Sequence, residues 1–388
     1  MKTATLRHDF TEIFHTPAQH TYFAPGRINL IGEYTDFNGG HVFPCAISLG
    51  TYAAVAGRDD QTIRLYSANF PDAGILEFTL DDLVNENTSD WDNYAKGMVK
   101  FIQAHGYTIK HGFDAYLQGD LPNAAGLSSS ASIEMLFGEI LNDLNDFDID
   151  PIERVKIGVE TENKFIGVQS GIMDQFAVQM GQAEQAVLLD TNTLDYELIP
   201  IKLGNYVIVI MNTNKRRALT DSKYNERRSQ CEAALAKLQT NLAINSLGDL
   251  NNEQFDENTY LIDDETLIKR ARHAVSENQR TLLAAAALQD NDLETFGKLV
   301  NASHISLKYD FEVSGKELDT LVASAWQQPG VLGARMTGAG FGGCAIAIVA
   351  KDQLDDFEHN VGTAYRTAIG YDADFYVAEI ADGPKRLD

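Results

Sequence analysis

Residues 122–146 read PNAAGLSSSASIEMLFGEILNDLND, a loop of small residues that runs directly into a segment with periodic apolar side chains. Those side chains recur at intervals of three and four residues, namely Ile133, Leu136, Phe137, Ile140, Leu141 and Leu144. They share one face of an α-helix, because such a helix turns once in about 3.6 residues. The stretch therefore predicts an amphipathic helix that begins near Ser128 and buries one face.

The loop before this helix has few bulky side chains and ends in consecutive serines, Ser128 to Ser130. A helix N-terminus presents unpaired N–H groups and about half a unit of positive charge, so such a loop lets a phosphate group approach closely. Serine is also a common N-cap, which accounts for one serine but poorly for three. Phosphate binding is favoured. The loop is not a Walker A loop, since no GxxxxGK[ST] occurs, and the HRD and DFG motifs of protein kinases are absent too.

A second glycine-rich run, MTGAGFGGCAIAIVA (336–350), leads into a strand-like segment and not into a helix. This order excludes a Rossmann dinucleotide motif, in which the glycines follow a strand and open a helix. A tight hairpin turn is one interpretation. The run has more glycines than a turn needs, so a close approach of its backbone to a ligand or to another backbone is the alternative.

An arginine and two carboxylates, Arg27, Glu33 and Asp36, lie in the stretch APGRINLIGEYTDFNGG (24–40). The surrounding glycines and asparagines are typical of turns, so we expect these side chains to face a cleft. A further carboxylate, Asp174, lies among apolar neighbours in VQSGIMDQFAVQMG (168–181). A carboxylate in such surroundings needs a partner, and Arg27 is the candidate. The alternative is that Asp174 only caps a helix.

The composition of the chain, 388 residues with an excess of acidic side chains, limits its partners. There are 31 Lys and Arg against 56 Asp and Glu, a formal net charge of −25 at pH 7. A field of that sign repels phosphate backbones and anionic lipids, so we expect neither nucleic acid nor a membrane as a partner. The N-terminal sequence has no apolar signal region, and the three cysteines are far apart. A cytoplasmic location fits both features.

Strand patterns and helix patterns are grouped unevenly along the chain. Short strand patterns dominate the first half, at residues 41–58, 61–69, 112–122 and 185–201. The second half carries long helical patterns at residues 222–238, 265–289 and 292–307. Strand patterns lie on either side of them, at residues 206–213 and 344–350. Strands first and helices later favour an α+β fold over a regular βαβ winding. We expect two domains, residues 1–200 and 201–388.

Three separated blocks, residues 24–40, 122–132 and 336–344, resemble the three signature motifs of the GHMP small-molecule kinases. Within that superfamily, the first block is similar to the galactokinase signature. The stretches SGIMDQFA, DNYAKG after Trp91, and KYNERR extend the resemblance to nearly the whole chain. It implies an N-terminal and a C-terminal α+β domain with the active site at the interface between them.

The resemblance also implies a reaction, the ATP-dependent phosphorylation of the C1 hydroxyl of α-D-galactose to galactose 1-phosphate, the first committed step of galactose use. Galactose and ATP would be the substrates, Mg²⁺ the metal ion, and the protein a monomer. By position, Asp174 would take the hydroxyl proton and Arg27 would stabilise charge on the reacting groups.

The resemblance assigns binding roles to other positions of this sequence. The sugar would contact Glu33, Tyr34, Thr35, Asp36, Gly171 and Tyr224. The nucleotide would contact Ser67, Trp91, Ala124, Ala125, Gly126, Leu127, Ser128, Ser129 and Ser130. The metal positions would be Ser130 and Glu162.

The sequence departs from the family pattern at two positions. Tyr34 stands where the family usually has His, and Ala124 where it usually has Gly. Two alternatives stay open: a GHMP kinase that acts on N-acetylgalactosamine or another sugar, and a galactose- and ATP-binding regulator without turnover.

Overall fold

The computed structural model describes residues 3–85, 91–122, 126–215 and 220–388, and the structural statements below concern that part of the chain. Its strands are β1 (His20–Asn29), β2 (His41–Val42), β3 (Pro44–Gly57), β4 (Thr62–Ser67), β5 (Leu76–Thr79), β6 (Phe113–Gly119), β7 (Gln185–Asp190), β8 (Tyr196–Pro200), β9 (Tyr206–Asn212), β10 (Val331–Met336), β11 (Cys344–Ala350), β12 (Asp374–Ala378) and β13 (Lys385–Arg386). Its helices are α1 (Thr3–Phe14), α2 (Asp92–Ala104), α3 (Ser129–Leu144), α4 (Pro151–Glu160), α5 (Met173–Gln179), α6 (Thr220–Leu238), α7 (Asn252–Asn258), α8 (Glu265–Gln289), α9 (Leu293–Ser306), α10 (Gly315–Ala325) and α11 (Leu354–Ile369).

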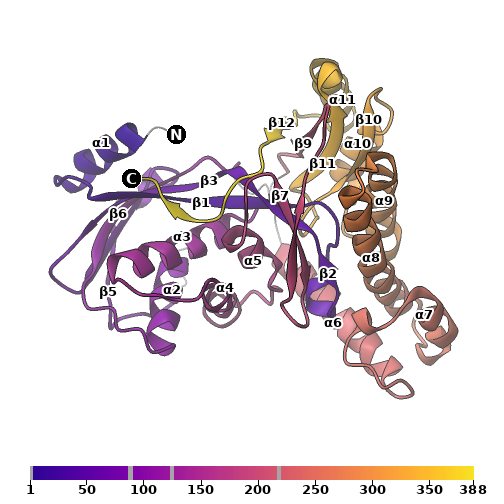
Figure 1. Cartoon of the computed structure of the whole chain (residues 1–388), viewed down its shortest axis with the longest axis horizontal. Coiled ribbons are helices and arrows are strands. Elements are labelled where there is room, and N and C mark those ends of the chain that lie inside the picture. Colours follow the sequence, from indigo (N-terminus) through magenta and orange to yellow (C-terminus); the bar gives the residue numbers. More distant parts are fainter. Residues whose placement is uncertain (1–2, 86–90, 123–125, 216–219) are drawn as a thin grey trace.

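The first half of the chain is built on a six-stranded sheet with the strand order β13-β1-β3-β6-β4-β5. Neighbouring strands are antiparallel except β4 and β6, which run parallel. Helices α2 to α5 cover one face of this sheet and α1 covers the other (Figure 1). The apolar face of α3 packs into the core of this half, where Leu136, Phe137, Ile140 and Leu141 are fully buried. The predicted helix is confirmed, with its start at Ser129.

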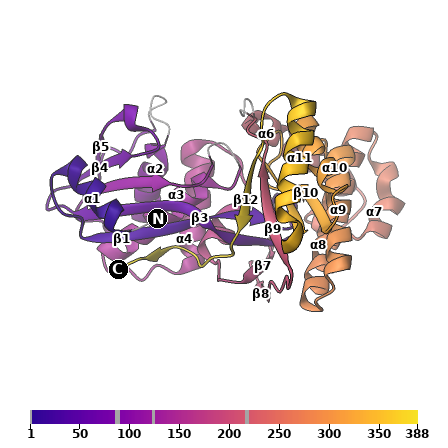
Figure 2. The ribbon, with the colours of Figure 1, turned by 90° about the horizontal axis from the view of Figure 1, so that it is seen from above.

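The second half of the chain carries an antiparallel four-stranded sheet with the order β10-β11-β9-β12. Helices α8 to α11 gather around it, and the sheet stands between these helices and the first half (Figure 2). A small sheet of β2, β7 and β8 lies where the halves meet (Figure 1). Apolar side chains of both halves, such as Ile28 on β1 and Ile346 on β11, share one core across that junction.

The glycine-rich run forms the connection between β10 and β11, as a hairpin. Gly338, Gly340, Gly342 and Gly343 all have positive φ angles, a conformation that glycine adopts without strain. Gly338 also approaches the serine loop, since a Cβ built there would lie 3.0 Å from the carbonyl oxygen of Gly126. Both interpretations of this run therefore hold: it is a turn, and its backbone packs closely against another backbone.

One expectation about local structure is wrong. Arg27 lies inside strand β1 and is 4% exposed, whereas the surrounding glycines and asparagines had indicated a turn. The register of β1 with β3 shifts between Pro25 and Gly26, so the strand accommodates these residues at an irregularity.

The end of the chain returns to the first half. Strand β13 pairs with β1 through Tyr22 and Phe23 (Figure 2). The backbone N–H of Thr21 donates a 2.9 Å hydrogen bond to Asp388, which also forms an ion pair with Arg7. The division into residues 1–200 and 201–388 stays a prediction, and the last residues pack on the sheet of the first unit.

Two further properties concern the described residues as a whole. No helix among them combines the length and the apolar character needed to cross a lipid bilayer. Cys45, Cys231 and Cys344 are buried free thiols.

Candidate active site

A cavity of about 370 Å³ lies where the two halves of the chain meet. Twelve of the residues that the sequence singles out line it: Arg27, Glu33, Tyr34, Asp36, Gly126, Ser128, Ser129, Ser130, Glu162, Gly171, Asp174 and Tyr224. They come from the first two motif blocks, from residues 162–174 and from α6, so the fold brings distant segments of the sequence to one place. The cavity is therefore the candidate active site.

Arg27 and Asp174 form a two-pronged ion pair in this cavity. The guanidinium Nε and Nη2 atoms donate to the two carboxylate oxygens at 2.8 and 2.9 Å. The remaining Nη1 atom donates to the carbonyl oxygen of Gly126 at 2.8 Å, which joins the pair to the serine loop. Arg27 is 4% exposed, whereas the Asp174 side chain is 28% exposed. The predicted partnership is confirmed, and its carboxylate is the member that a substrate can reach.

Ser128 contributes a third hydrogen bond to the same carboxylate. Its hydroxyl donates to Asp174 at 2.6 Å and makes no capping bond at the start of α3. The residue has a φ of 60°, a left-handed conformation that is uncommon for serine. An N-cap role for this side chain is thus excluded. The hydroxyl instead helps to hold Asp174, at the point where the N-terminus of α3 reaches the cavity.

The other predicted metal and phosphate positions meet beside this pair. The hydroxyl of Ser130 donates to Glu162 at 3.0 Å, and both side chains line the cavity. The second oxygen of Glu162 accepts bonds from Ser170 and Gln175, at 2.7 and 2.9 Å. Burial raises the pKa of Glu162 above its usual value. In the described part of the chain, no group of three or more His, Cys, Asp and Glu could hold a metal ion.

Asp36, Gly171 and Tyr224 form another part of the lining. Burial, together with the negative charge of Asp174, raises the pKa of Asp36 to about 6. Gly171 packs directly on this carboxylate, since a Cβ at Gly171 would lie 1.9 Å from an Asp36 oxygen. Burial also raises the pKa of Tyr224 well above its usual value, so its hydroxyl is protonated and can donate a hydrogen bond.

Tyr34 and Glu33 connect the cavity to the glycine-rich turn. The Tyr34 hydroxyl donates to the carbonyl oxygen of Ala339 at 2.5 Å, and its ring packs against Phe311 and Tyr224. The Glu33 carboxylate accepts a 2.9 Å bond from the N–H of Gly338 and is 1% exposed. Glu33 faces the cavity, as the sequence predicts, but both residues are nearly fully buried because groups of the second half of the chain hold them.

Several predicted site residues lie away from the cavity lining. The Thr35 hydroxyl contacts the carbonyl oxygens of Gly32 and His41, at 2.8 and 2.6 Å. Ser67 and Leu127 are buried, and Trp91 packs in the core of the first half. Ala124 and Ala125 lie outside the described residues.

Gly338, one of the glycines expected to approach a ligand or another backbone, also lines the cavity. The lining further includes residues that sequence reasoning did not select: Tyr94, Val168, Ser170, Met173 and Ala339. All but Val168 lie inside stretches that carry the family resemblance, so position in a motif was the available signal. Tyr94 follows Trp91 by three residues, and α2 turns Tyr94 toward the cavity while Trp91 packs in the core.

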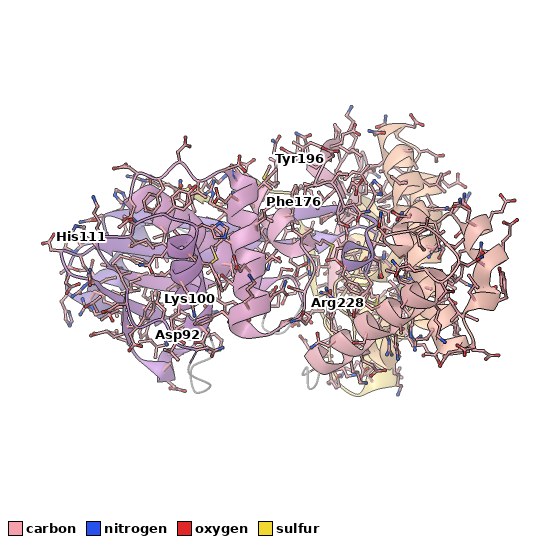
Figure 3. All side chains as sticks on the ribbon, turned by 90° about the horizontal axis from the view of Figure 1, so that it is seen from below. Asp92, Lys100, His111, Phe176, Tyr196 and Arg228 are labelled. Carbon is pink, nitrogen blue, oxygen red and sulfur yellow. The ribbon has the colours of Figure 1, made fainter. Side chains whose placement is uncertain are left out.

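Arg228, labelled in Figure 3, joins the two halves of the chain next to the loop that carries Gly171. Its Nη1 donates to the carbonyl oxygen of Gln169 at 2.9 Å, and its guanidinium lies 5.6 Å from the ring centre of Phe37. The residue belongs to α6, whereas Gln169 precedes Gly171 on the loop that packs against Asp36. The position of this loop therefore depends on both halves of the chain.

Comparisons with known proteins cover the whole chain. Residues 8–57 match the galactokinase galactose-binding signature. Residues 93–182 match the N-terminal domain of GHMP kinases, and residues 284–367 match their C-terminal domain. A galactokinase of Lactiplantibacillus plantarum and one of Levilactobacillus brevis are each 64% identical to this chain over 387 residues, covering 100% of both chains.

Solved structures agree with these matches. The crystal structure of Lactococcus lactis galactokinase complexed with galactose is 53% identical in sequence to this chain and has a TM-score of 0.97. The match covers 99% of this chain and 100% of that one. A mevalonate kinase, at 19% identity and a TM-score of 0.65, shares the fold alone over 93% of this chain and 99% of its own. The similarity thus spans both halves and the junction where the cavity lies.

Proposed function

The chain belongs to the galactokinase family of the GHMP kinases, and we propose that its cavity is where it phosphorylates galactose to galactose 1-phosphate with ATP. The Arg27–Asp174 pair beside the start of α3 is the observation that carries this proposal. It combines a carboxylate that a hydroxyl can reach with a helix N-terminus that suits a phosphate group. Asp174 and Arg27 are the proposed catalytic residues.

Asp174 has the geometry of a residue that orients the C1 hydroxyl of α-D-galactose. A carboxylate has about four acceptor positions, and Arg27 and Ser128 use three of them. The position left over can accept the hydroxyl proton. Phosphoryl transfer has a loose transition state, so alignment and charge neutralisation are the main work of the protein. Asp174 would therefore take the proton late, as the bond between oxygen and phosphorus forms.

Arg27 supports the reaction by fixing the carboxylate of Asp174. Its three bonds to Asp174 and Gly126 fix the carboxylate relative to the serine loop. That geometry keeps the distance between the attacking hydroxyl and the phosphate short, and alignment of this kind can contribute roughly 7–11 kcal/mol. The guanidinium also adds positive charge where the reacting groups meet.

Galactose and the triphosphate would occupy opposite sides of this pair. Glu33, Asp36, Gly171, Tyr34 and Tyr224 would surround the sugar, because carboxylates accept hydrogen bonds from hydroxyls and Tyr224 can donate one. The serine loop and the N–H groups at the start of α3 would hold the phosphates. The positive end of that helix and Arg27 make a local site for an anion in an acidic protein, where distant charges are screened beyond about 10 Å.

Ser130 and Glu162 suit Mg²⁺, because a hydroxyl and a carboxylate oxygen stand 3.0 Å apart at the cavity wall. Magnesium prefers oxygen ligands and commonly combines one or two carboxylates with substrate phosphates. When bound, the ion neutralises charge on the phosphate oxygens. We expect EDTA to abolish turnover. We also expect Glu162→Gln to weaken ATP binding in calorimetry with Mg²⁺ present and to leave it unchanged without Mg²⁺.

The test of the proposed function is release of ADP over a panel of hexoses, compared between the wild type and Asp174→Asn. We expect turnover with galactose and a kcat for the variant lower by about 100-fold to 10,000-fold, the usual contribution of a proton acceptor. Asp72→Asn, at an exposed carboxylate outside the cavity lining, is the control. A near-normal kcat in Asp174→Asn would refute the role of Asp174.

The same panel separates the remaining alternatives. Preferred turnover of N-acetylgalactosamine would indicate another sugar kinase of the superfamily, and binding without ADP release would indicate a regulator. The intact Arg27–Asp174 pair favours turnover, because sugar and nucleotide can bind without it. The monomeric state and the cytoplasmic location stay predictions.

A further inference from the structure

Arg335 is a fully buried cation in strand β10, and it lies outside the lining of the cavity. Its Nη1 atom donates to the carbonyl oxygen of Asn29 at 3.1 Å, and its Nη2 atom forms an ion pair with Glu33. Asn29 and Glu33 belong to the first half of the chain, whereas Arg335 belongs to the second. A buried arginine therefore holds, from across the junction, a carboxylate that lines the cavity.

A second buried carboxylate, Glu277 on α8, completes this cluster. One of its oxygens lies 3.9 Å from Nη2 of Arg335 and accepts bonds from the N–H of Gly32 and the hydroxyl of Ser303, at 3.1 and 2.5 Å. Its other oxygen accepts a 2.8 Å bond from Nε of Arg280. Since Gly32 directly precedes Glu33, Glu277 fixes the backbone of Glu33 while Arg335 fixes its side chain.

The Glu33 carboxylate is thereby held by the protein, and although its side chain is only 1% exposed it belongs to the lining of the cavity. One of its oxygens accepts the N–H of Gly338, and the other pairs with Arg335. A carboxylate has about four acceptor positions, so those not used by the protein can face a sugar hydroxyl in the cavity. Burial raises the pKa of Glu33 above its usual value, and the Arg335 guanidinium acts against this rise by stabilising the charged carboxylate.

We propose that Arg335 and Glu277 are positioning residues that fix Glu33, and that they thereby determine how strongly the protein selects the sugar hydroxyl that Glu33 faces. The proposal rests on the proposed function, since it concerns the sugar side of the same cavity. Neither residue touches the substrate. Both act through Glu33, whose orientation sets a charge-assisted hydrogen bond.

The requirement for arginine at position 335 follows from its geometry. A guanidinium is planar and carries five N–H donors in fixed directions, so one group can serve a backbone carbonyl and two carboxylates together. A lysine would keep the charge but has a single ammonium. Stability by itself gives no reason for such a cluster, because buried ion pairs are often replaced by apolar side chains without loss of stability.

The test compares Arg335→Lys and Glu277→Gln with the wild type, using steady-state kinetics for both substrates. We expect the KM for galactose to rise about 10-fold to 100-fold in Arg335→Lys, the range that corresponds to one charge-assisted hydrogen bond. The KM for ATP should change by less than about 3-fold, because the serine loop is not part of this cluster. Glu277→Gln keeps the side-chain shape and should give a smaller rise in the same direction.

A panel of monodeoxygalactoses supplies a readout that a purely structural role would not move. In the wild type, the sugar that lacks the Glu33-facing hydroxyl should lose about 10-fold to 100-fold in kcat/KM. In Arg335→Lys the loss in kcat/KM for that one deoxygalactose should disappear, while the losses for the other deoxygalactoses should stay as in the wild type. Effects of Glu33→Ala and Arg335→Lys should also be non-additive in the double variant, since the two groups act together.

Arg270→Met is the matched control, because Arg270 is also buried but bonds Asp310, Glu312 and Gln230, none of which lines the cavity. It should lose stability and keep the galactose KM. The proposal would be overturned if either variant, Arg335→Lys or Glu277→Gln, folds and keeps both the wild-type KM for galactose and the wild-type losses in kcat/KM for the deoxygalactoses. If Arg335→Lys does not fold, Glu277→Gln decides. A wild type that does not phosphorylate galactose would instead refute the proposed function.

Discussion

Two arginine–carboxylate pairs lie near the junction between the halves, one within the first half and one across the junction, and they differ in burial. In the Arg27–Asp174 pair the carboxylate is 28% exposed and lines the cavity. In the Arg335–Glu33 pair the two side chains are 0% and 1% exposed. The first pair leaves its carboxylate widely accessible from the cavity, whereas in the second pair the arginine is fully buried and Glu33 reaches the cavity only as a nearly buried part of its lining.

The difference shows how one chemical pairing serves two purposes. An arginine beneath an accessible carboxylate fixes the direction of a reacting group, so its loss should appear in the rate. An arginine that is sealed with its carboxylate joins two parts of the fold, so its loss should appear in stability and in sugar affinity. Four substitutions test this contrast, in order of decreasing effect.

The largest effect is expected from Arg335→Met on stability. Removal of one partner from a sealed ion pair leaves Glu33 and Glu277 without their shared cation, and this typically costs about 3–5 kcal/mol of unfolding free energy. Urea unfolding monitored by fluorescence measures the loss. Arg27→Met should lose less, because Asp174 can be hydrated from the cavity. Equal losses of unfolding free energy in Arg335→Met and Arg27→Met would show that the difference in burial between the two ion pairs has no effect on stability.

The next effect is a loss of rate in Arg27→Met. Without its two-pronged partner, Asp174 is no longer aligned with the serine loop, and kcat should fall about 100-fold to 1,000-fold, as for loss of one preorganised donor. The KM for galactose should change little. Steady-state kinetics at saturating ATP give both values. A raised KM with an unchanged kcat would mean that Arg27 serves binding instead of the chemical step.

A smaller effect is expected from Ser128→Ala. The variant loses one hydrogen bond to the Asp174 carboxylate and keeps both bonds from Arg27, so kcat should fall about 10-fold. Ser229→Ala is the control, since Ser229 is exposed on α6 and does not line the cavity. The two variants are compared by kcat under identical conditions. A normal kcat in Ser128→Ala would show that Arg27 alone holds Asp174.

The smallest effect concerns Asp36, whose pKa is raised from 3.8 to about 6. Between these values the folded protein keeps a proton that the unfolded chain has released, so this group lowers stability as the pH rises through that window. Asp36→Asn removes the effect and should be more stable than the wild type at pH 7.5. At pH 4 the advantage should vanish. Thermal midpoints at both pH values measure the difference, and a constant difference would contradict the assignment.

Much of the site could be predicted from local sequence because its motifs are short and contiguous. The apolar spacing from Ile133 onward fixes α3, and the small residues before it bring the serine loop to the cavity. The partnership of Arg27 with Asp174 was predictable from chemistry, since a carboxylate among apolar residues needs a cation. The conformation of Ser128, which turns its hydroxyl to Asp174, was not, because it depends on the packing around the loop.

Features that depend on distant segments escaped sequence reasoning. Arg335 has partners near residue 30 and on α8, and nothing in its own strand marks them. Strand β1 was missed because Pro25 and Gly26 are turn residues, yet Gly26 is needed where Leu121 and Leu127 come close. Thr35 lies within a motif but contacts only backbone carbonyls, which shows that motif membership does not place a side chain in the cavity.

The pairing of β13 with β1 sets an order of events during protein synthesis. Strand β1 leaves the ribosome early, but its partner at residues 385–386 is translated only after the whole second half. Until then β1 is an unprotected edge that can pair with strands of other nascent chains. Chaperone contact in this interval, or a fusion partner attached after residue 388, would therefore affect whether β13 pairs with β1 and completes the six-stranded sheet.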